Sequence, residues 1–152
     1  MIYNALKLIH VLSIIVWIGG MVFAHFFLRP AAQQLEAPQR VQLMHGVLQR
    51  FLGAVAVAIV LVLTSGLGMI GAVSIGSGGT FAMPLKWTIM ATLGIVMMGI
   101  FAYIYFALLG RLEQAVAASD WAAGGQALAR IRTWVGVNLI IGVAIVVQTL
   151  LM

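Results

Sequence analysis

Apolar residues gather into four long runs along the chain, separated by shorter polar linkers. The runs cover about residues 5–28, 47–73, 85–109 and 134–152. Each is long enough to cross the hydrocarbon core of a bilayer as a helix, which takes about 20 residues. Backbone groups in lipid must pair with one another, and the runs lack the alternation of a membrane barrel strand. The pattern therefore predicts an all-α, integral membrane four-helix bundle that forms a single domain over residues 1–152.

The linkers differ in charge, and this difference predicts the orientation of the bundle. Three arginines lie between Arg29 and Arg50 and three more between Gly110 and Thr133, whereas residues 72–84 carry no charge. Positively charged linkers stay on the cytoplasmic side of a membrane. We therefore expect an inner (plasma) membrane protein with both termini on the non-cytoplasmic side. The linker at residues 110–133 is expected to form a cytoplasmic helical hairpin extension.

Composition narrows the classes of function. The chain is 64% hydrophobic and 7% charged, with a net charge of +5 and no cysteine. Cysteine is therefore excluded as a disulfide partner, a metal ligand or a nucleophile. The basic residues flank the apolar runs, so we expect the lipid bilayer as their partner and no nucleic acid. The only acidic residues, Glu36, Glu113 and Asp120, lie in linkers, and hydrolytic acid–base chemistry is not expected.

Polar side chains at membrane depth are functional candidates because burying an ionisable group in lipid is costly. In the predicted topology they form two tiers. The outer tier contains His10 and Lys86, with Thr64, Ser65 and Gln148 near the same level. The inner tier contains His25, Arg29, His45, Arg50 and Asn138, and Trp17 lies between the two. His10 and His25 are 15 residues apart, or about 22 Å on a straight helix, so they cannot ligate one centre together.

The histidines leave alternatives open. His10 is either a ligand to copper or haem iron through a neutral ring nitrogen, or an interfacial histidine held by hydrogen bonds. His25 and His45 are either solvated at a basic boundary or reserve ligands for an inner centre. Lys86 follows a proline at the start of the third run, where a lysine can extend its ammonium group to the interface.

Methionine is abundant, with nine residues in the chain. Met83, Met90 and Met97 recur at a spacing of seven and share one face of the third helix. Thioether sulfur is a soft ligand suited to Cu(I), and methionine also fills irregular cores. Met21, Met90 and Met97 are therefore candidate copper ligands, and core packing explains the same pattern.

The first run resembles a known family. Leu6-Lys7-Leu8-Ile9-His10, followed by Trp17-Ile18-Gly19-Gly20 and Leu28-Arg29-Pro30, is similar to the opening helix of the CopD-type copper-resistance membrane proteins. The later segments Arg50-Phe51, Thr64-Ser65-Gly66, Leu85-Lys86-Trp87 and Arg132 to Asn138 resemble that family in order. The resemblance implies a four-helix membrane protein that handles copper.

A more distant resemblance points to haem. The first-helix His10 and Trp17, and Lys86 near the start of the third helix, are similar to residues of the HemJ-type protoporphyrinogen oxidases. That likeness implies haem b as the cofactor. The lysine would then pair with a haem propionate or another anionic ligand, an attraction that is strengthened where lipid excludes water. Both resemblances share His10, Lys86 and Trp17.

Three hypotheses follow from the sequence. The first is a CopD-like protein that handles copper or binds a metal centre within the bundle. The second is a haem b redox protein that uses His10, with His25 and His45 as an axial pair. The third is a non-catalytic structural or accessory subunit whose polar side chains only join helices. Whether the protein is an enzyme stays open, and a second copy of the chain or a periplasmic metal-carrying protein are the partners considered.

Overall fold

The structure consists of four long helices and contains no β-strand. The computed structural model describes residues 1–152. The first helix is built from α1 (Ile2–Val22), η1 (Phe23–Leu28) and α2 (Arg29–Ala32), and the second is α3 (Ala37–Gly76). The third helix combines α4 (Leu85–Tyr103), η2 (Ile104–Leu108) and α5 (Leu109–Ala117), and the fourth is α6 (Trp121–Leu151). All four are long and apolar enough to cross a membrane, which confirms the predicted fold class.

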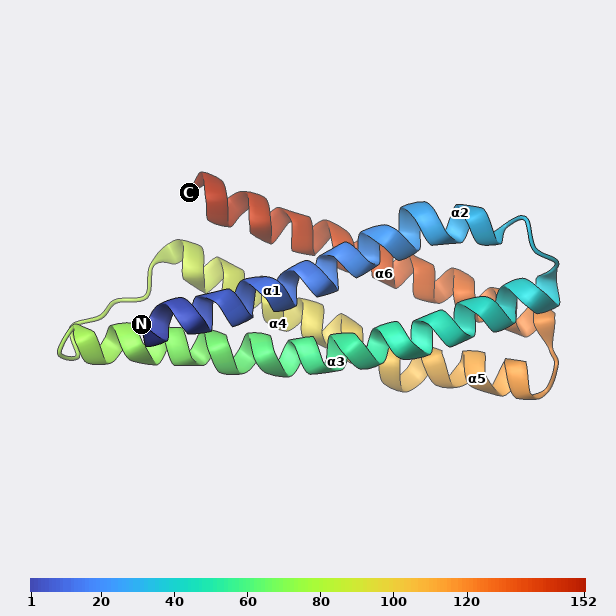
Figure 1. The fold of residues 1–152 in the computed structure, drawn as a ribbon, viewed down its shortest axis with the longest axis horizontal. Coiled ribbons are helices and arrows are strands. Elements are labelled where there is room, and N and C mark those ends of the chain that lie inside the picture. Colours follow the sequence, from blue (N-terminus) through green and yellow to red (C-terminus); the bar gives the residue numbers. More distant parts are fainter.

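The bundle has two distinct ends (Figure 1). The N-terminus, the C-terminus and the connection between α3 and α4 lie at one end, here called the termini end. The connections from α2 to α3 and from α5 to α6 lie at the other, here called the arginine end because Arg29, Arg40 and Arg132 are found there. Which end faces the cytoplasm stays a prediction.

The helices extend past the apolar runs at the arginine end. α3 begins at Ala37, with Pro38 in its first turn, and its 40 residues make it about 60 Å long. The hydrocarbon core is only about 30 Å thick. At the start of α6 the Asp120 side chain accepts a hydrogen bond from the Ala123 backbone N–H at 3.1 Å, as an N-cap residue does. These helix ends therefore lie outside the hydrocarbon.

The arginine end is closely packed. Val41 of α3 and Leu112 of α5 have no exposed surface, and Ile131 of α6 is 2% exposed. α6 approaches α3 so closely that a Cβ atom on Gly124 would lie 2.7 Å from a Val41 methyl carbon. Such a separation is shorter than any normal carbon–carbon contact. The three helices therefore share a core that has no space for an added methyl group at this position.

The termini end is open by comparison. α1 packs along α3, and α4 packs along α6. The last buried residues toward this end are Ser13 in α1, Ser65 in α3, Met97 in α4 and Gly142 in α6. The two helix pairs therefore separate toward the termini, as Figure 1 shows for α1 and α6.

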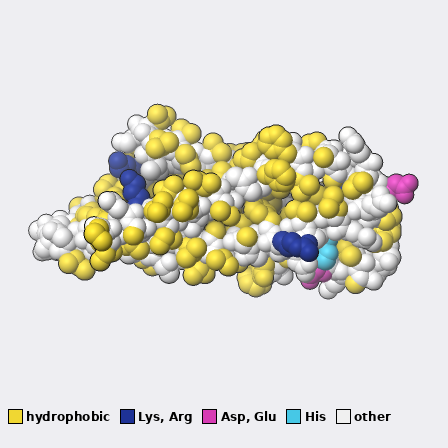
Figure 2. Space-filling model, viewed as in Figure 1, with side chains coloured by type: hydrophobic (Ala, Val, Ile, Leu, Met, Phe, Trp, Pro, Cys, Tyr) yellow, Lys and Arg dark blue, Asp and Glu magenta, His cyan; other side chains and the backbone are white.

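Apolar side chains cover the outside of the molecule. Figure 2 shows hydrophobic side chains along its whole length and few charged ones. Large residues such as Phe106, Ile140 and Leu67 are 79%, 72% and 68% exposed. An aqueous protein rarely exposes so continuous an apolar surface, whereas lipid covers it at no cost.

The contact between Gly124 and Val41 gives a test of the fold. Alanine favours a helix over glycine by about 1 kcal/mol, but overpacking a core costs about 1–3 kcal/mol. We expect Gly124→Ala to lower the thermal unfolding midpoint in detergent. Gly125→Ala, with open space around the same added methyl group, should raise that midpoint. Equal shifts in the two variants would contradict the close approach of α6 to α3.

Candidate functional site

His10 is held between α1 and α3. Its Nδ1 atom lies 3.1 Å from the Val62 carbonyl oxygen and 3.1 Å from the Ser65 hydroxyl oxygen. The single hydroxyl hydrogen of Ser65 is already donated to the Leu61 carbonyl on its own helix. Both neighbours of Nδ1 therefore act as acceptors, and Nδ1 must carry the proton.

The Nε2 atom of His10 is consequently unprotonated in the neutral ring. No hydrogen bond of the structure involves this atom, so its lone pair is free. Metal-binding histidines have this arrangement, in which one ring N–H is donated to a carbonyl and the other nitrogen ligates. Gly66 adds to the fit, because a Cβ atom there would lie only 3.3 Å from the His10 Cε1 atom.

Deeper in the bundle lie Trp17 and two buried methionines. Trp17 is 5% exposed, and its ring meets Phe101 of α4 edge to face with centroids 6.4 Å apart. Met21 and Met97 belong to the same buried core. Met90 is only half-buried and lies two helical turns closer to the termini end than Met97 on α4. The structure thus places two of the three candidate thioethers inside the bundle.

Asn138 lies next to this core and joins α6 to α4. Its side-chain amide donates a hydrogen bond to the Met97 carbonyl oxygen at 3.3 Å. Its Oδ1 atom is buried and has no hydrogen-bond partner. A buried polar atom without a partner is uncommon in folded proteins and often marks a place where an ion or water binds.

Lys86 is separate from His10 in the structure. It lies half-buried near the start of α4, where its backbone carbonyl accepts a hydrogen bond from the Gln148 side chain of α6 at 3.3 Å. No hydrogen bond or ion pair joins Lys86 to His10. The predicted outer tier therefore consists of one polar group on the α1–α3 pair and another on the α4–α6 pair.

The predicted inner tier is also divided. His25 faces Gly136 of α6. The Nε2 atom of His45 lies 3.9 Å from a Glu113 carboxylate oxygen of α5 and has no hydrogen-bond partner. The two histidines thus contact different helices, and no contact pairs them.

Arg50 is exposed and donates a hydrogen bond to the Gly46 carbonyl at 3.0 Å. Nowhere do three His, Cys, Asp or Glu residues form a group that could hold a metal ion.

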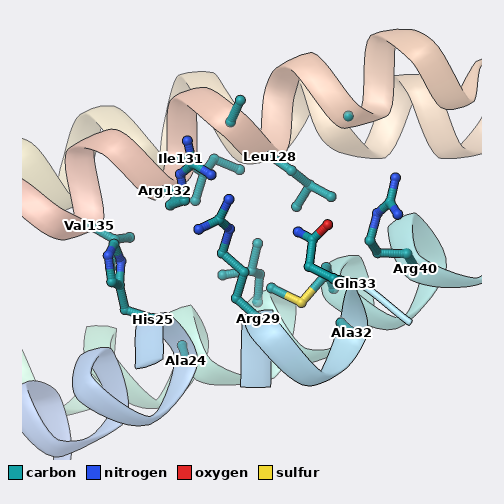
Figure 3. Close-up of a pocket in the computed structure, with 14 residues that line it drawn as sticks. Ala24, His25, Arg29, Ala32, Gln33, Arg40, Leu128, Ile131, Arg132 and Val135 are labelled. Carbon is teal, nitrogen blue, oxygen red and sulfur yellow. The ribbon is translucent and has the colours of Figure 1, made fainter. Parts of the chain in front are cut away.

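A cavity of about 190 Å³ opens at the arginine end, in front of His25 and Arg29 (Figure 3). Gln33, Arg40 and Arg132 also line it. Sequence reasoning named His25 and Arg29 as site candidates, but it used Arg40 and Arg132 only to predict orientation and gave Gln33 no role, so it missed these three residues as parts of one site. A signal was available, because antiparallel helices bring both arginine-rich linkers to the same end of the bundle.

The family described as copper resistance protein D matches residues 45–152, more than two thirds of the chain. The matched part contains most of α3 and all of the helices that follow it, and it begins after α1. No curated protein and no solved structure matches. The family match confirms the predicted CopD-type resemblance, and together with the four apolar helices it indicates a multi-pass membrane protein. The chain belongs to the copper resistance protein D family.

Proposed function

We propose that this protein handles copper inside its helix bundle in the inner (plasma) membrane, with His10 as the first ligand. The family to which the chain belongs is described by copper resistance, and this description favours copper over other metals. Copper is here the cargo of the protein. A periplasmic metal-carrying protein is the partner that would deliver it to the termini end.

One observation carries the proposal for His10. The carbonyl of Val62 and the hydroxyl of Ser65 hold the proton on Nδ1 and leave the Nε2 lone pair free. The neutral ring is thus oriented in advance with Nε2 unprotonated, so binding a metal requires neither a change of tautomer nor the loss of a proton from that ring. His10 is also in the open half of the bundle, which leaves the ring reachable.

Distance assigns the methionines to a second position. Met21 follows His10 by 11 residues on the same helix, which corresponds to about 16 Å. One ion cannot bind both side chains. Met21 and Met97 both belong to the buried core, and Asn138, whose Oδ1 atom has no partner, is bonded to the Met97 backbone. We therefore assign these two thioethers, which are suited to Cu(I), to a deeper position. Copper would pass from the imidazole of His10 to this pair.

Replacing His10 tests the first position. We expect His10→Ala to abolish tight Cu(I) binding at the termini end, measured by competition with a coloured Cu(I) chelator under reducing conditions. Ser65→Ala should weaken the same site by about tenfold, because it removes one of two groups that orient the ring. His45→Ala is the matched imidazole control and should bind as the unmodified protein does. Undiminished binding in His10→Ala would refute the proposed role.

Replacing Met97 tests the deeper position. Met97→Leu keeps the side-chain volume nearly constant and removes the sulfur atom, so the fold should be preserved. We expect this variant to bind fewer copper ions per protein while His10 still binds one. Met98→Leu, at the half-buried neighbouring position, should leave the copper stoichiometry unchanged. If both variants bind copper as the unmodified protein does, the methionines serve only as packing.

The free Nε2 atom of His10 would serve a haem iron as well as a copper ion. The absorbance spectrum of the purified protein distinguishes bound haem from bound copper. A strong Soret band that is lost in His10→Ala would replace copper by haem b in this proposal. A protein without such a band that binds Cu(I) through His10 supports copper.

A further inference from the structure

The cavity at the arginine end lies at the opposite end of the bundle from His10, and the copper proposal makes no use of it. It is lined by η1, α2, the first turns of α3 and the first half of α6 (Figure 3). Its polar lining consists of His25, Gln33 and the three arginines Arg29, Arg40 and Arg132. Its other walls are apolar or small, among them Leu48, Ile131 and Val135.

No acidic side chain balances this charge. The lining of the cavity contains no Asp or Glu. Of the three acidic residues in the chain, Glu113 lies beside His45, Asp120 caps α6 and Glu36 is exposed just before α3. No arginine forms a salt bridge. Three half-buried guanidinium groups therefore share one cavity without a protein counter-ion.

The arginines are directed into the cavity by the local structure. Figure 3 shows the Arg29 side chain extending from its helix toward α6, where Arg132 approaches from the opposite side. Arg40 is restrained by a hydrogen bond that it donates to the Leu35 carbonyl at 3.3 Å. Arg29 directly follows the π-helical segment η1, and such segments alter the direction of side chains and occur frequently at functional sites.

This convergence is unfavourable unless an anion is present. Like charges repel more strongly where the surroundings exclude water, and partly buried guanidinium groups lose hydration. Arginine is well suited to bind phosphate, because its planar group donates two parallel hydrogen bonds to a pair of phosphate oxygens. A group of three arginines with a glutamine amide between them offers more donors than one phosphate group can use.

The size and position of the cavity define the ligand further. Water occupies about 30 Å³ per molecule in the liquid, so a cavity of about 190 Å³ admits a phosphate group with a few waters. Arg29 lies where the first apolar run ends, which is the depth of lipid headgroups. Basic pockets between membrane helices bind anionic headgroups in this way.

We propose that this cavity binds a phosphate-bearing anion through Arg29, Arg40 and Arg132, and that the headgroup of an anionic phospholipid supplies it. The apolar wall formed by Leu48, Ile131 and Val135 then lies beside the glycerol and the first acyl carbons. An inorganic phosphate ion has the same charged group but makes no use of this wall.

Thermal unfolding of the purified full chain in neutral detergent tests the proposal. We expect phosphatidylglycerol to raise the unfolding midpoint, phosphatidylcholine to have no such effect, and inorganic phosphate to act only at far higher concentration. Arg29→Gln and Arg132→Gln should each weaken phosphatidylglycerol binding by about tenfold, since each removes charged hydrogen bonds. Arg111→Gln, an exposed arginine outside the cavity, is the control and should retain full binding.

A second variant keeps the test independent of folding defects. Gln33 extends between Arg29 and Arg40 (Figure 3), and Gln33→Glu places a carboxylate there without a change of size. This variant should be more stable than the unmodified protein without lipid and should no longer respond to phosphatidylglycerol. Gln126→Glu, exposed on α6 and outside the cavity, should show neither effect.

The possible results separate cleanly. Stabilisation by inorganic phosphate at the same concentration as by phosphatidylglycerol would retain the phosphate site and overturn the lipid as its source. The site would be overturned if phosphatidylglycerol and phosphatidylcholine stabilised the protein equally. It would also be overturned if the lipid response were unchanged in Arg29→Gln, Arg132→Gln and Gln33→Glu. Copper binding at His10 is unaffected by either outcome.

Discussion

Polar groups at membrane depth have no water to bind, so leaving one without a partner is costly and most find a partner within the bundle. Most hydroxyl groups do so on their own helix: Ser13, Thr64 and Thr92 each donate to the backbone carbonyl four residues earlier. Such bonds satisfy the hydroxyl but do not join helices. Only a few longer polar side chains reach a neighbouring helix, and in the open half of the bundle these contacts add to the apolar packing within each helix pair.

These contacts form two sets. His10 joins α1 to α3, whereas Asn138 and Gln148 join α6 to α4. No hydrogen bond crosses between the two pairs in the open half, and the pairs separate toward the termini. The imidazole of His10 is therefore held by one helix pair and stays only half-buried, a combination of rigidity and access that a metal ligand requires. At the arginine end, close packing of α3, α5 and α6 holds the pairs together.

The termini end offers soft and imidazole ligands for a cation, whereas the arginine end offers a cavity for an anion. The charges of the two proposed ligands relate these sites to each other. A copper ion that moves from His10 toward Met21 and Met97 approaches three arginines that carry no protein counter-ion. Uncompensated, their positive field would oppose a cation. A phosphate group in the cavity would neutralise part of that field. The anion site would thus favour both the stability of the arginine end and the deeper copper position, although each site can be tested without the other.

Much of the fold follows from the sequence alone. Lipid cannot form hydrogen bonds with backbone groups, so the four apolar runs must form helices. Short linkers make neighbouring helices antiparallel. The depths of His10 and His25 along the bundle could therefore be predicted. The sequence also carried the family resemblance. Side-chain partners were not predictable, because depth along the membrane does not determine rotation about each helix axis. Rotation is decided by packing, which directs His10 to Ser65 rather than to Lys86. Packing also brings Arg29, Arg40 and Arg132, from three different helices, around one cavity.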